Sequence, residues 1–435
     1  LCFPFIFRGA LDVGATTIND EMKIACIEGI AQLARATTSA EAAAAYQGEH
    51  LSFGADYLIP KPFDPRLMGV VASAVAQDAM ETGVATRPIE DIEAYKQSLD
   101  GSVFKSALIM RPVFDAASTG QRKLVFAEGE DERVLRAANA ILEETLDMPS
   151  PIGRPDGVEA RIERAGLPIK IGRDFELVNP ESDARYRDYW TTYHGLMERR
   201  GVTPDLARAV MRTNTTAIGA VMVHRGEADS LICGTFGQYL WHLKYINEIL
   251  GTTDLHPVGA LSLMIMEDAP LFIADTQVHP EPTPHQIAEP VIAAARHSKR
   301  FGVAPKIALC SHSQFGNLDC DTGRRMRGAL EILDSTPRAF SYEGEMHADA
   351  ALDPELRARI MPNARIEGAA NVLVFANTDA ASGVRNILKM KAGGLEVGPI
   401  LMGMGNRGHI VTPSITARGL LNISALAGTP ASHYG

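Results

Sequence analysis

Apolar positions in the first hundred residues recur at helical spacing. Their period predicts an amphipathic helix over residues 21–35, capped by Asn19 or Asp20. The apolar face of this helix consists of Met22, Ala25, Cys26, Ile30 and Leu33. A second helix rich in small residues is predicted over residues 66–81.

From Arg122 onward the pattern changes to short apolar runs that alternate with amphipathic helical stretches. The runs are KLVFAEG, SLICG, LFIAD, KIALCS, NVLVFAN and GPILMG, each bounded by glycine or a polar turn. This order predicts an α/β fold with parallel sheets and helices on both faces. Because a single core stops growing near roughly 250 to 300 residues, we expect two lobes with a cleft between them.

Composition narrows the class of protein. The 435 residues are 46% hydrophobic and 22% charged, which is typical of a soluble globular protein. The formal charge of -11 argues against a nucleic acid partner. No apolar run approaches the roughly 20 residues of a membrane helix, and the 5 scattered cysteines fit a reducing compartment. We therefore expect a cytoplasmic protein without a membrane partner.

A literal GxGxxG stands at residues 403–408, with Gly403 first, after the strand-like GPIL. A dinucleotide fingerprint needs a helix directly after its glycines and an acidic residue about 20 positions later. Here the extended HIVTPS follows, and residues 421–426 contain no carboxylate. The motif is therefore interpreted as a glycine turn that lines the pocket of a different ligand.

Candidate polar side chains also stand in two other segments. His347 and Asp349 could be metal ligands or an acid/base pair, although a structural hydrogen bond between them is the favoured interpretation. Ser311, His312 and Ser313 follow the run KIALC, at the edge where α/β sheets place ligands. We expect this loop to contact a ligand without catalysing a reaction.

Threonines and an asparagine precede the apolar helix that begins near Ile218. Any residue of Thr213–Thr216 may cap that helix, and a helix start also offers N–H groups to an anion. Capping and phosphate binding both stay open at this point. The segment Cys233-Gly234-Thr235 ends another predicted strand, and Lys244 lies on the helix after it.

Residues 122–428 resemble a phosphotransacetylase, and residues 1–23 resemble the end of a malic enzyme. The first resemblance is carried by AEGEDERVLRAAN, GRDFELVNP, MRTNTTAIGA, ICGTF and GEMHADAA. The pairing is similar to that in the hybrid malic enzymes of bacteria. It implies the end of an NAD(P)-binding domain over 1–83, a linker over 84–105 and a phosphotransacetylase-like domain over 106–435. Lobe 1 would comprise about 106–255 and 399–435, and lobe 2 about 256–398.

The same resemblance implies a ligand site with one departure. Active phosphotransacetylases read like KPVNDLSRGxS after GPILxG, whereas this chain has Thr412-Pro413 in place of Ser-Arg. Proline brings neither charge nor N–H to a developing oxyanion, so acyl transfer should be slow or absent. The expected acetyl-CoA-contacting residues are Thr235, Lys244, Ser311, His312, Ser313, Asn377, Asp379, Asn386, Gly403, Asn406, Arg407, Thr412, Pro413 and Ser414.

Taken together, the resemblance implies a catalytically silent domain through which acetyl-CoA inhibits a malic enzyme allosterically. The parent reaction would convert malate to pyruvate and CO2 with NADP and Mg or Mn, and this chain itself would hold no cofactor or metal. Expected partners are an upstream malic enzyme domain and further copies, as dimers through this domain and a hexamer or larger ring. A working phosphate acetyltransferase and a purely structural oligomerisation domain are the alternatives.

Overall fold

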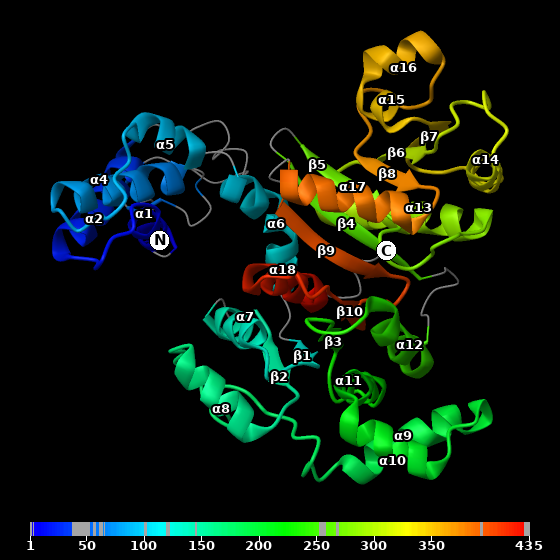
Figure 1. Ribbon diagram of the computed structural model, residues 1–435, viewed down its shortest axis with the longest axis horizontal. Coiled ribbons are helices and arrows are strands. Elements are labelled where there is room, and N and C mark those ends of the chain that lie inside the picture. The colour runs from blue at the N-terminus through cyan, green and yellow to red at the C-terminus, as the bar shows by residue number, and fades with distance from the viewer. Residues whose placement is uncertain are drawn as a thin grey trace. The chain divides into compact units, whose positions relative to one another are not determined.

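The computed structural model divides the chain into two compact units, Leu1–Ile109 and Met110–Gly435 (Figure 1). The residues that it describes are 2, 4–36, 53–54, 58–60, 64, 66–99, 102–118, 122–143, 146–251, 258–266, 269–391 and 395–429. No helix among them is both long and apolar enough to cross a membrane.

The described part of the first unit is helical. Its elements are α1 (Phe5–Asp12), α2 (Asp20–Arg35), the π-helical turn η1 (Met68–Ala72), α4 (Ser73–Glu81) and α5 (Ile92–Leu99). Helix α2 begins as predicted, because the Asn19 Oδ1 accepts a hydrogen bond from the Met22 N–H at 2.9 Å. Gly9 lets α1 cross η1 closely, since a Cβ there would lie 2.4 Å from the Ala72 carbonyl oxygen. The buried faces of α2 and α4 form the core of this unit.

The segment expected to be a linker, residues 84–105, instead contains α5 and the start of α6 (Ser102–Ala117). Ile89, Ile92 and Tyr95 pack against the core of the first unit. The Tyr95 hydroxyl also donates to Asp12 at 2.8 Å. Apolar side chains among the charges of this segment therefore fold it onto the helices before it.

The second unit contains two sheets. The smaller has the order β10-β3-β1-β2, and every pair in it is parallel. Its strands are β1 (Lys123–Phe126), β2 (Met148–Pro151), β3 (Ser230–Cys233) and β10 (Gly408–Ile410). The helices that belong to it are α7 (Glu132–Glu143), α8 (Pro155–Arg164), α9 (Tyr186–Met197), α10 (Pro204–Thr213), α11 (Thr215–His224), α12 (Tyr239–Leu250) and α18 (Ala417–Gly428), with the short 3-10 helix η2 (Glu198–Arg200) between α9 and α10.

The larger sheet has the order β7-β6-β8-β5-β4-β9. Its strands are β4 (Gly259–Ile265), β5 (Pro270–Ala274), β6 (Lys306–Cys310), β7 (Ser341–Met346), β8 (Val372–Phe375) and β9 (Leu395–Met402). The helices around it are α13 (Pro284–Arg300), α14 (Asp321–Asp334), α15 (Ala348–Leu352), α16 (Pro354–Ile360) and α17 (Thr378–Lys391). Strands β7, β6, β8 and β5 are parallel, whereas β4 runs antiparallel to both β5 and β9.

Each strand run that the sequence predicts is a strand, and helices cover both faces of the larger sheet. Ile273 faces the core cluster that includes Ala381 of α17. The neighbouring Phe272 packs on Phe301, the residue after α13, with ring centroids 5.6 Å apart. Successive side chains of a strand point to opposite faces, so α17 and α13 lie on opposite sides of this sheet.

The chain returns to the smaller sheet later than expected. Strand β9 pairs with β4 as far as Met402, so residues 399–402 belong to the second sheet rather than to lobe 1. Only β10 rejoins β3. Helix α18 then contacts β9 of one sheet and β1, β3 and β10 of the other, and it lies beside both in Figure 1. This helix therefore joins the two sheets into one unit.

Candidate functional site

A pocket of about 410 Å³ opens at the carboxyl ends of β6, β7 and β8. Its polar lining includes Ser311 and His312 after β6, His347 after β7 and Asn377 after β8, together with Thr322 of α14. Parallel strands bring these loops together at one edge. Ser311 and His312 of the loop after KIALC line this pocket, and their contact with a ligand stays a prediction.

The two histidines of this pocket are tied together. Their rings are nearly parallel, at 14°, with centroids 6.2 Å apart. The His347 Nε2 lies 2.9 Å from the His312 carbonyl oxygen, and because a carbonyl only accepts, Nε2 carries the proton. The expected hydrogen bond between His347 and Asp349 is absent in this part of the structure, since Asp349 lies in the first turn of α15 and accepts from the Ala350 N–H at 2.7 Å.

Ser313 anchors the loop from beneath the pocket. Its buried hydroxyl lies 2.5 Å from Oε1 of the buried Glu345. Oε1 also accepts from the Arg327 guanidinium at 2.8 Å and the Gly316 N–H at 2.9 Å. The expectation that Ser313 contacts a ligand is therefore corrected: its side chain holds the backbone on which Ser311 and His312 stand.

Helix α17 begins at this pocket. The Asn377 Oδ1 accepts from the Ala380 N–H at 2.9 Å and caps the helix. Asp379 and Asn386 lie on the exposed surface of the same helix and do not line the pocket. Lys389 follows twelve residues after Asn377, roughly 18 Å farther along the axis at 1.5 Å per residue.

A second polar cluster lies at the carboxyl ends of β1, β3 and β10, around Arg133. Its Nη1 donates to the carbonyl oxygens of Pro413, at 2.6 Å, and Ile415, at 2.9 Å. Its Nη2 donates to the Thr235 carbonyl at 2.9 Å and to Asp131 at 2.6 Å. Arg133 thus brings the buried Thr235 next to Pro413 of the loop Thr412–Ser414 through their backbone oxygens, and their contact with a ligand stays a prediction.

The loop Thr412–Ser414 also meets the second sheet. Lys389 Nζ donates to the Ser414 Oγ at 3.2 Å, and the Ser414 and Thr412 hydroxyls are 3.2 Å apart. Lys389 also pairs with Glu396 at 3.1 Å. Glu396 is buried in a two-pronged ion pair with Arg385, with Arg385 Nη2 2.9 Å from Oε2. A cation from another element therefore lies beside the loop that lacks the expected arginine.

Glu128 lies at the end of β1 in the second cluster. Both of its carboxylate oxygens accept from the Gly234 N–H at 3.1 Å. Burial raises the pKa of Glu128 to about 7, although these backbone hydrogen bonds oppose that shift. Gly234 has φ +102°, and a Cβ there would lie 2.4 Å from the Val411 carbonyl oxygen, so glycine is required.

Two predicted ligand residues in the turn between β9 and β10 have structural roles instead. The buried Asn406 amide lies 2.8 Å from the Leu426 carbonyl, at the end of α18. Arg407 donates to Leu250 and Gly251 carbonyls, at 2.8 and 3.1 Å, at the end of α12. The last carbonyls of a helix lack partners within the helix, and these side chains supply them. Gly403 has φ +84° in the same turn.

The strand β10 follows this turn directly, where a dinucleotide fingerprint would have a helix. The sequence interpretation of residues 403–408 as a glycine turn is confirmed. The accompanying prediction that Gly403, Asn406 and Arg407 line a ligand pocket receives no support from their contacts.

The remaining predicted positions lie around α11 and α12. Asn214 caps α11 through the Ala217 N–H at 2.9 Å, so capping is confirmed for this residue. The Thr216 hydroxyl lies 2.8 Å from Nδ1 of the buried His242, whose Nε2 donates to the Phe236 carbonyl at 2.7 Å. Lys244 is exposed on α12, with Nζ 5.6 Å from the Tyr245 ring centroid.

Sequence reasoning missed Arg133, Glu128 and Lys389. For the first two a signal existed, because both lie within the AEGEDER stretch that follows a buried strand. Such a position is the ligand edge of a parallel sheet. No local pattern marks Lys389, whose partner Ser414 is brought to it only by the packing of two sheets.

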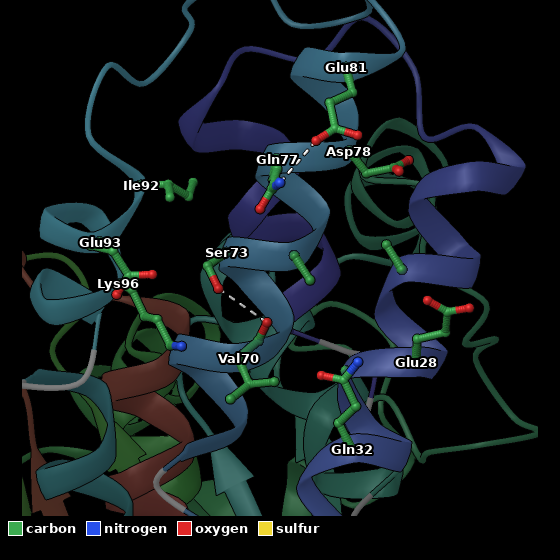
Figure 2. A pocket seen from close by; sticks show the side chains of 13 residues that line it. Glu28, Gln32, Val70, Ser73, Gln77, Asp78, Glu81, Ile92, Glu93 and Lys96 are labelled. Atoms are coloured by element: carbon green, nitrogen blue, oxygen red, sulfur yellow. Dashed lines mark hydrogen bonds between the residues drawn. The ribbon is translucent and has the colours of Figure 1, made fainter.

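A groove of about 440 Å³ lies in the first unit between α2, α4 and α5 (Figure 2). Acidic side chains of Glu28, Asp78, Glu81 and Glu93 line it together with Lys96. It contains none of the predicted site residues. Over the described residues, no group of three or more His, Cys, Asp or Glu side chains is arranged to hold a metal ion.

Comparison with known proteins places this geometry in context. The sequence model of the family described as phosphate acetyl/butaryl transferase matches residues 108–428. An NAD-dependent malic enzyme from Rhizobium meliloti (strain 1021) is 49% identical over 435 residues, which are 100% of this chain and 56% of the relative. An NADP-dependent malic enzyme from Escherichia coli (strain K12) is 47% identical over 98% of this chain and 56% of its own length.

The chain therefore spans about half the length of these curated relatives. Among solved structures, a phosphotransacetylase from Streptococcus pyogenes matches with a TM-score of 0.68 and 24% identity, over 74% of this chain and 98% of that one. The EutD phosphotransacetylase from Staphylococcus aureus matches with a TM-score of 0.65 and 24% identity, over 75% and 98%. At this identity the likeness shows the fold alone, and the predicted two-lobed α/β fold is confirmed.

Proposed function

Because the chain belongs to the phosphate acetyl/butaryl transferase family over residues 108–428, we propose that this region binds acetyl-CoA as a regulatory ligand without transferring its acetyl group. The malic enzymes that match 98 to 100% of the chain support a malic enzyme as the parent protein. In this proposal acetyl-CoA inhibits the parent reaction.

The loop Thr412–Ser414 carries the proposal. Pro413 is exposed, has no N–H, and its carbonyl accepts from Arg133. Acyl transfer develops negative charge on an oxygen, and removing one donor from an oxyanion site costs roughly 3 to 4 kcal/mol of activation free energy. The Arg133 guanidinium is fully engaged with backbone and Asp131, so it does not replace the missing arginine.

Binding would use both polar clusters. The pocket with Ser311, His312 and Asn377 offers hydroxyl, imidazole and amide groups, and the exposed loop offers Ser414 beside Lys389. The two clusters lie at opposite ends of α17. An extended anionic ligand such as a CoA thioester can contact both, with Lys389 near a negative group.

The whole-protein activity extends this proposal. We infer that the parent protein decarboxylates malate oxidatively to pyruvate and CO2 with a nicotinamide cofactor and Mg or Mn. The matching malic enzyme of Rhizobium meliloti is NAD-dependent and that of Escherichia coli is NADP-dependent, and NADP is the cofactor that the resemblance implies. No residue of this chain is assigned to the cofactor or the metal, and an upstream malic enzyme domain and a ring of dimers remain expected partners.

Two measurements on the purified chain test the proposal. Calorimetry with acetyl-CoA should give a saturable heat, and an assay for acetyl phosphate from acetyl-CoA and phosphate should show no enzymatic turnover. A flat titration would reject the regulatory role and leave oligomerisation as the function. That outcome would be checked by sedimentation of the same sample.

An active phosphate acetyltransferase is the second candidate, and one observation favours it. Lys389 places a positive charge beside Ser414, where a phosphate could be held as a point charge, although without the planar grip of arginine. If the native chain forms acetyl phosphate, and Lys389→Met loses this activity but still binds acetyl-CoA, the chain is an active phosphate acetyltransferase.

A further inference from the structure

Arg133 has a partner for every donor that it owns. A guanidinium carries five N–H groups in a fixed planar arrangement. Nε and Nη2 form a fork on Asp131, at 3.0 and 2.6 Å. The remaining three donors reach carbonyl oxygens of Thr235, Pro413 and Ile415. A side chain so fully partnered fixes the groups around it.

These partners belong to different loops that meet at one edge of the smaller sheet. Asp131 follows β1, Thr235 follows β3, and Pro413 and Ile415 follow β10. All three carbonyl contacts are to the backbone, so they do not depend on which side chains occupy positions 412 and 413. The backbone of the loop can therefore keep the same conformation without the Ser-Arg pair.

The Asp131 carboxylate orients Arg133. Burial alone would raise the pKa of Asp131, but the hydrogen bonds and charge of Arg133 outweigh burial and hold that pKa below its ordinary value. Asp131 also accepts from the backbone N–H of Arg133 at 2.8 Å. The carboxylate thus aims the guanidinium across the sheet edge toward the loop at residues 412–415.

The loop is held from the second sheet as well, by Lys389 on Ser414. Lys389 makes one contact to an exposed hydroxyl, whereas Arg133 makes two contacts to the loop backbone. We propose that Arg133 is a positioning residue, which fixes the loop 412–415 in the shape that receives acetyl-CoA. This inference rests on the proposed function, because the ligand is the one proposed above.

Arg133→Gln tests the inference, since glutamine cannot reach all three carbonyls. We expect its dissociation constant for acetyl-CoA, measured by calorimetry, to rise at least tenfold, the equivalent of losing about one hydrogen bond. Amide hydrogen exchange at Thr412, Ser414 and Ile415 should accelerate at least tenfold. Arg133→Lys keeps the charge with fewer directed donors and should fall between the two proteins.

Arg136→Gln is the matched control. Arg136 lies one turn along the same helix and is exposed, paired with Glu132 at 2.8 Å. We expect its dissociation constant and the loop exchange to stay within twofold of the native values. If Arg133→Gln does not fold, Asp131→Asn, which removes the orienting carboxylate, should reproduce the faster loop exchange.

Unchanged affinity together with unchanged loop exchange in Arg133→Gln would overturn the inference. The failure of the proposed function is a separate result. If the native chain binds no acetyl-CoA, the proposed function fails, while faster exchange at 412–415 confined to the Arg133 and Asp131 variants still establishes the positioning role.

Discussion

The carboxyl edges of the two sheets use polar residues in opposite ways. At the smaller sheet, Arg133 ties its own loop to the loops after β3 and β10 through backbone oxygens, so its donors are occupied within the protein. At the larger sheet, Ser313 and Glu345 anchor a loop from below, which leaves Ser311 and His312 open to a pocket. The edge of the smaller sheet thus fixes the positions of loops, whereas the edge of the larger sheet presents polar groups to a pocket.

The largest effect on stability is expected when the buried ion pair between Arg385 and Glu396, beside the larger sheet, is disturbed. The Arg385 side chain is only 6% exposed. Glu396→Ala removes the carboxylate that pairs with it and leaves a buried charge without this partner. Removing one partner of a buried pair costs about 3 to 5 kcal/mol of unfolding free energy. Urea denaturation measures this loss, with the exposed Glu331→Ala as control. A loss below 1 kcal/mol would mean that water or another group compensates Arg385.

The pH dependence of stability tests the burial of Glu128 at the edge of the smaller sheet. The folded pKa of Glu128 is about 7, against an ordinary 4.5. Between these two pH values the folded protein keeps a proton on Glu128 that the unfolded chain releases. The free energy of unfolding therefore falls as the pH rises through this range, and the whole decrease is present above the folded pKa. Glu128→Gln removes the loss and should be more stable than the native chain at pH 8 by about 1 to 3 kcal/mol.

The measurement is the difference between native and Glu128→Gln stability curves from pH 5 to 8. Burial also raises the pKa of Asp147 to about 7, but that group is common to both proteins and cancels. A difference that is constant across this range would show that Glu128 titrates in its ordinary range and that the polar edge is well hydrated.

Introducing the Ser-Arg pair of active phosphotransacetylases at positions 412 and 413 tests whether the loop 412–415 is held by its backbone contacts. In Thr412→Ser combined with Pro413→Arg, the Arg133 contacts to carbonyls 413 and 415 should persist. Acetyl-CoA affinity by calorimetry should stay within about tenfold, because single polar contacts are worth roughly 1 to 1.5 kcal/mol. A much larger loss would show that the two side chains at 412 and 413, and not the backbone contacts alone, decide whether the loop can receive the ligand.

The smallest effect is expected at Asp379, which the sequence placed in the site and the structure places on the exposed face of α17. Asp379→Ala should change unfolding free energy by less than about 1 kcal/mol, the range of a carboxylate in the first turn of a helix. Its acetyl-CoA dissociation constant should stay within twofold. A tenfold change would extend the binding surface along this helix.

Much of the fold could be predicted because its signals are local. The period of Met22, Cys26 and Leu33 predicted α2, and short apolar runs between glycines predicted the strands. The antiparallel strand β4 and the late return after Met402 escaped prediction. Strand direction depends on which partner a run meets, and an apolar run looks the same in either direction.

The site was predicted less completely. Ser311 and His312 were placed in a ligand-contacting loop because they follow an apolar strand run, the position where parallel sheets place ligands. Asn377 was a candidate only through the family resemblance, and the structure brings all three residues to one pocket. Asn406 and Arg407 were misassigned because a polar residue in a glycine turn looks the same whether it meets a ligand or a helix end. Their burial against carbonyls depends on residues far away in the chain.

By itself, the sequence determined the alternation of strands and helices, the capped helix starts and the absence of arginine at position 413, since each depends on neighbouring residues alone. Only the tertiary structure decided that Arg133 would hold the loop at 412–415 and that Lys389 would lie beside Ser414. The reason is physical: a hydrogen bond needs two atoms within about 3 Å, and the packing of separate elements sets that distance.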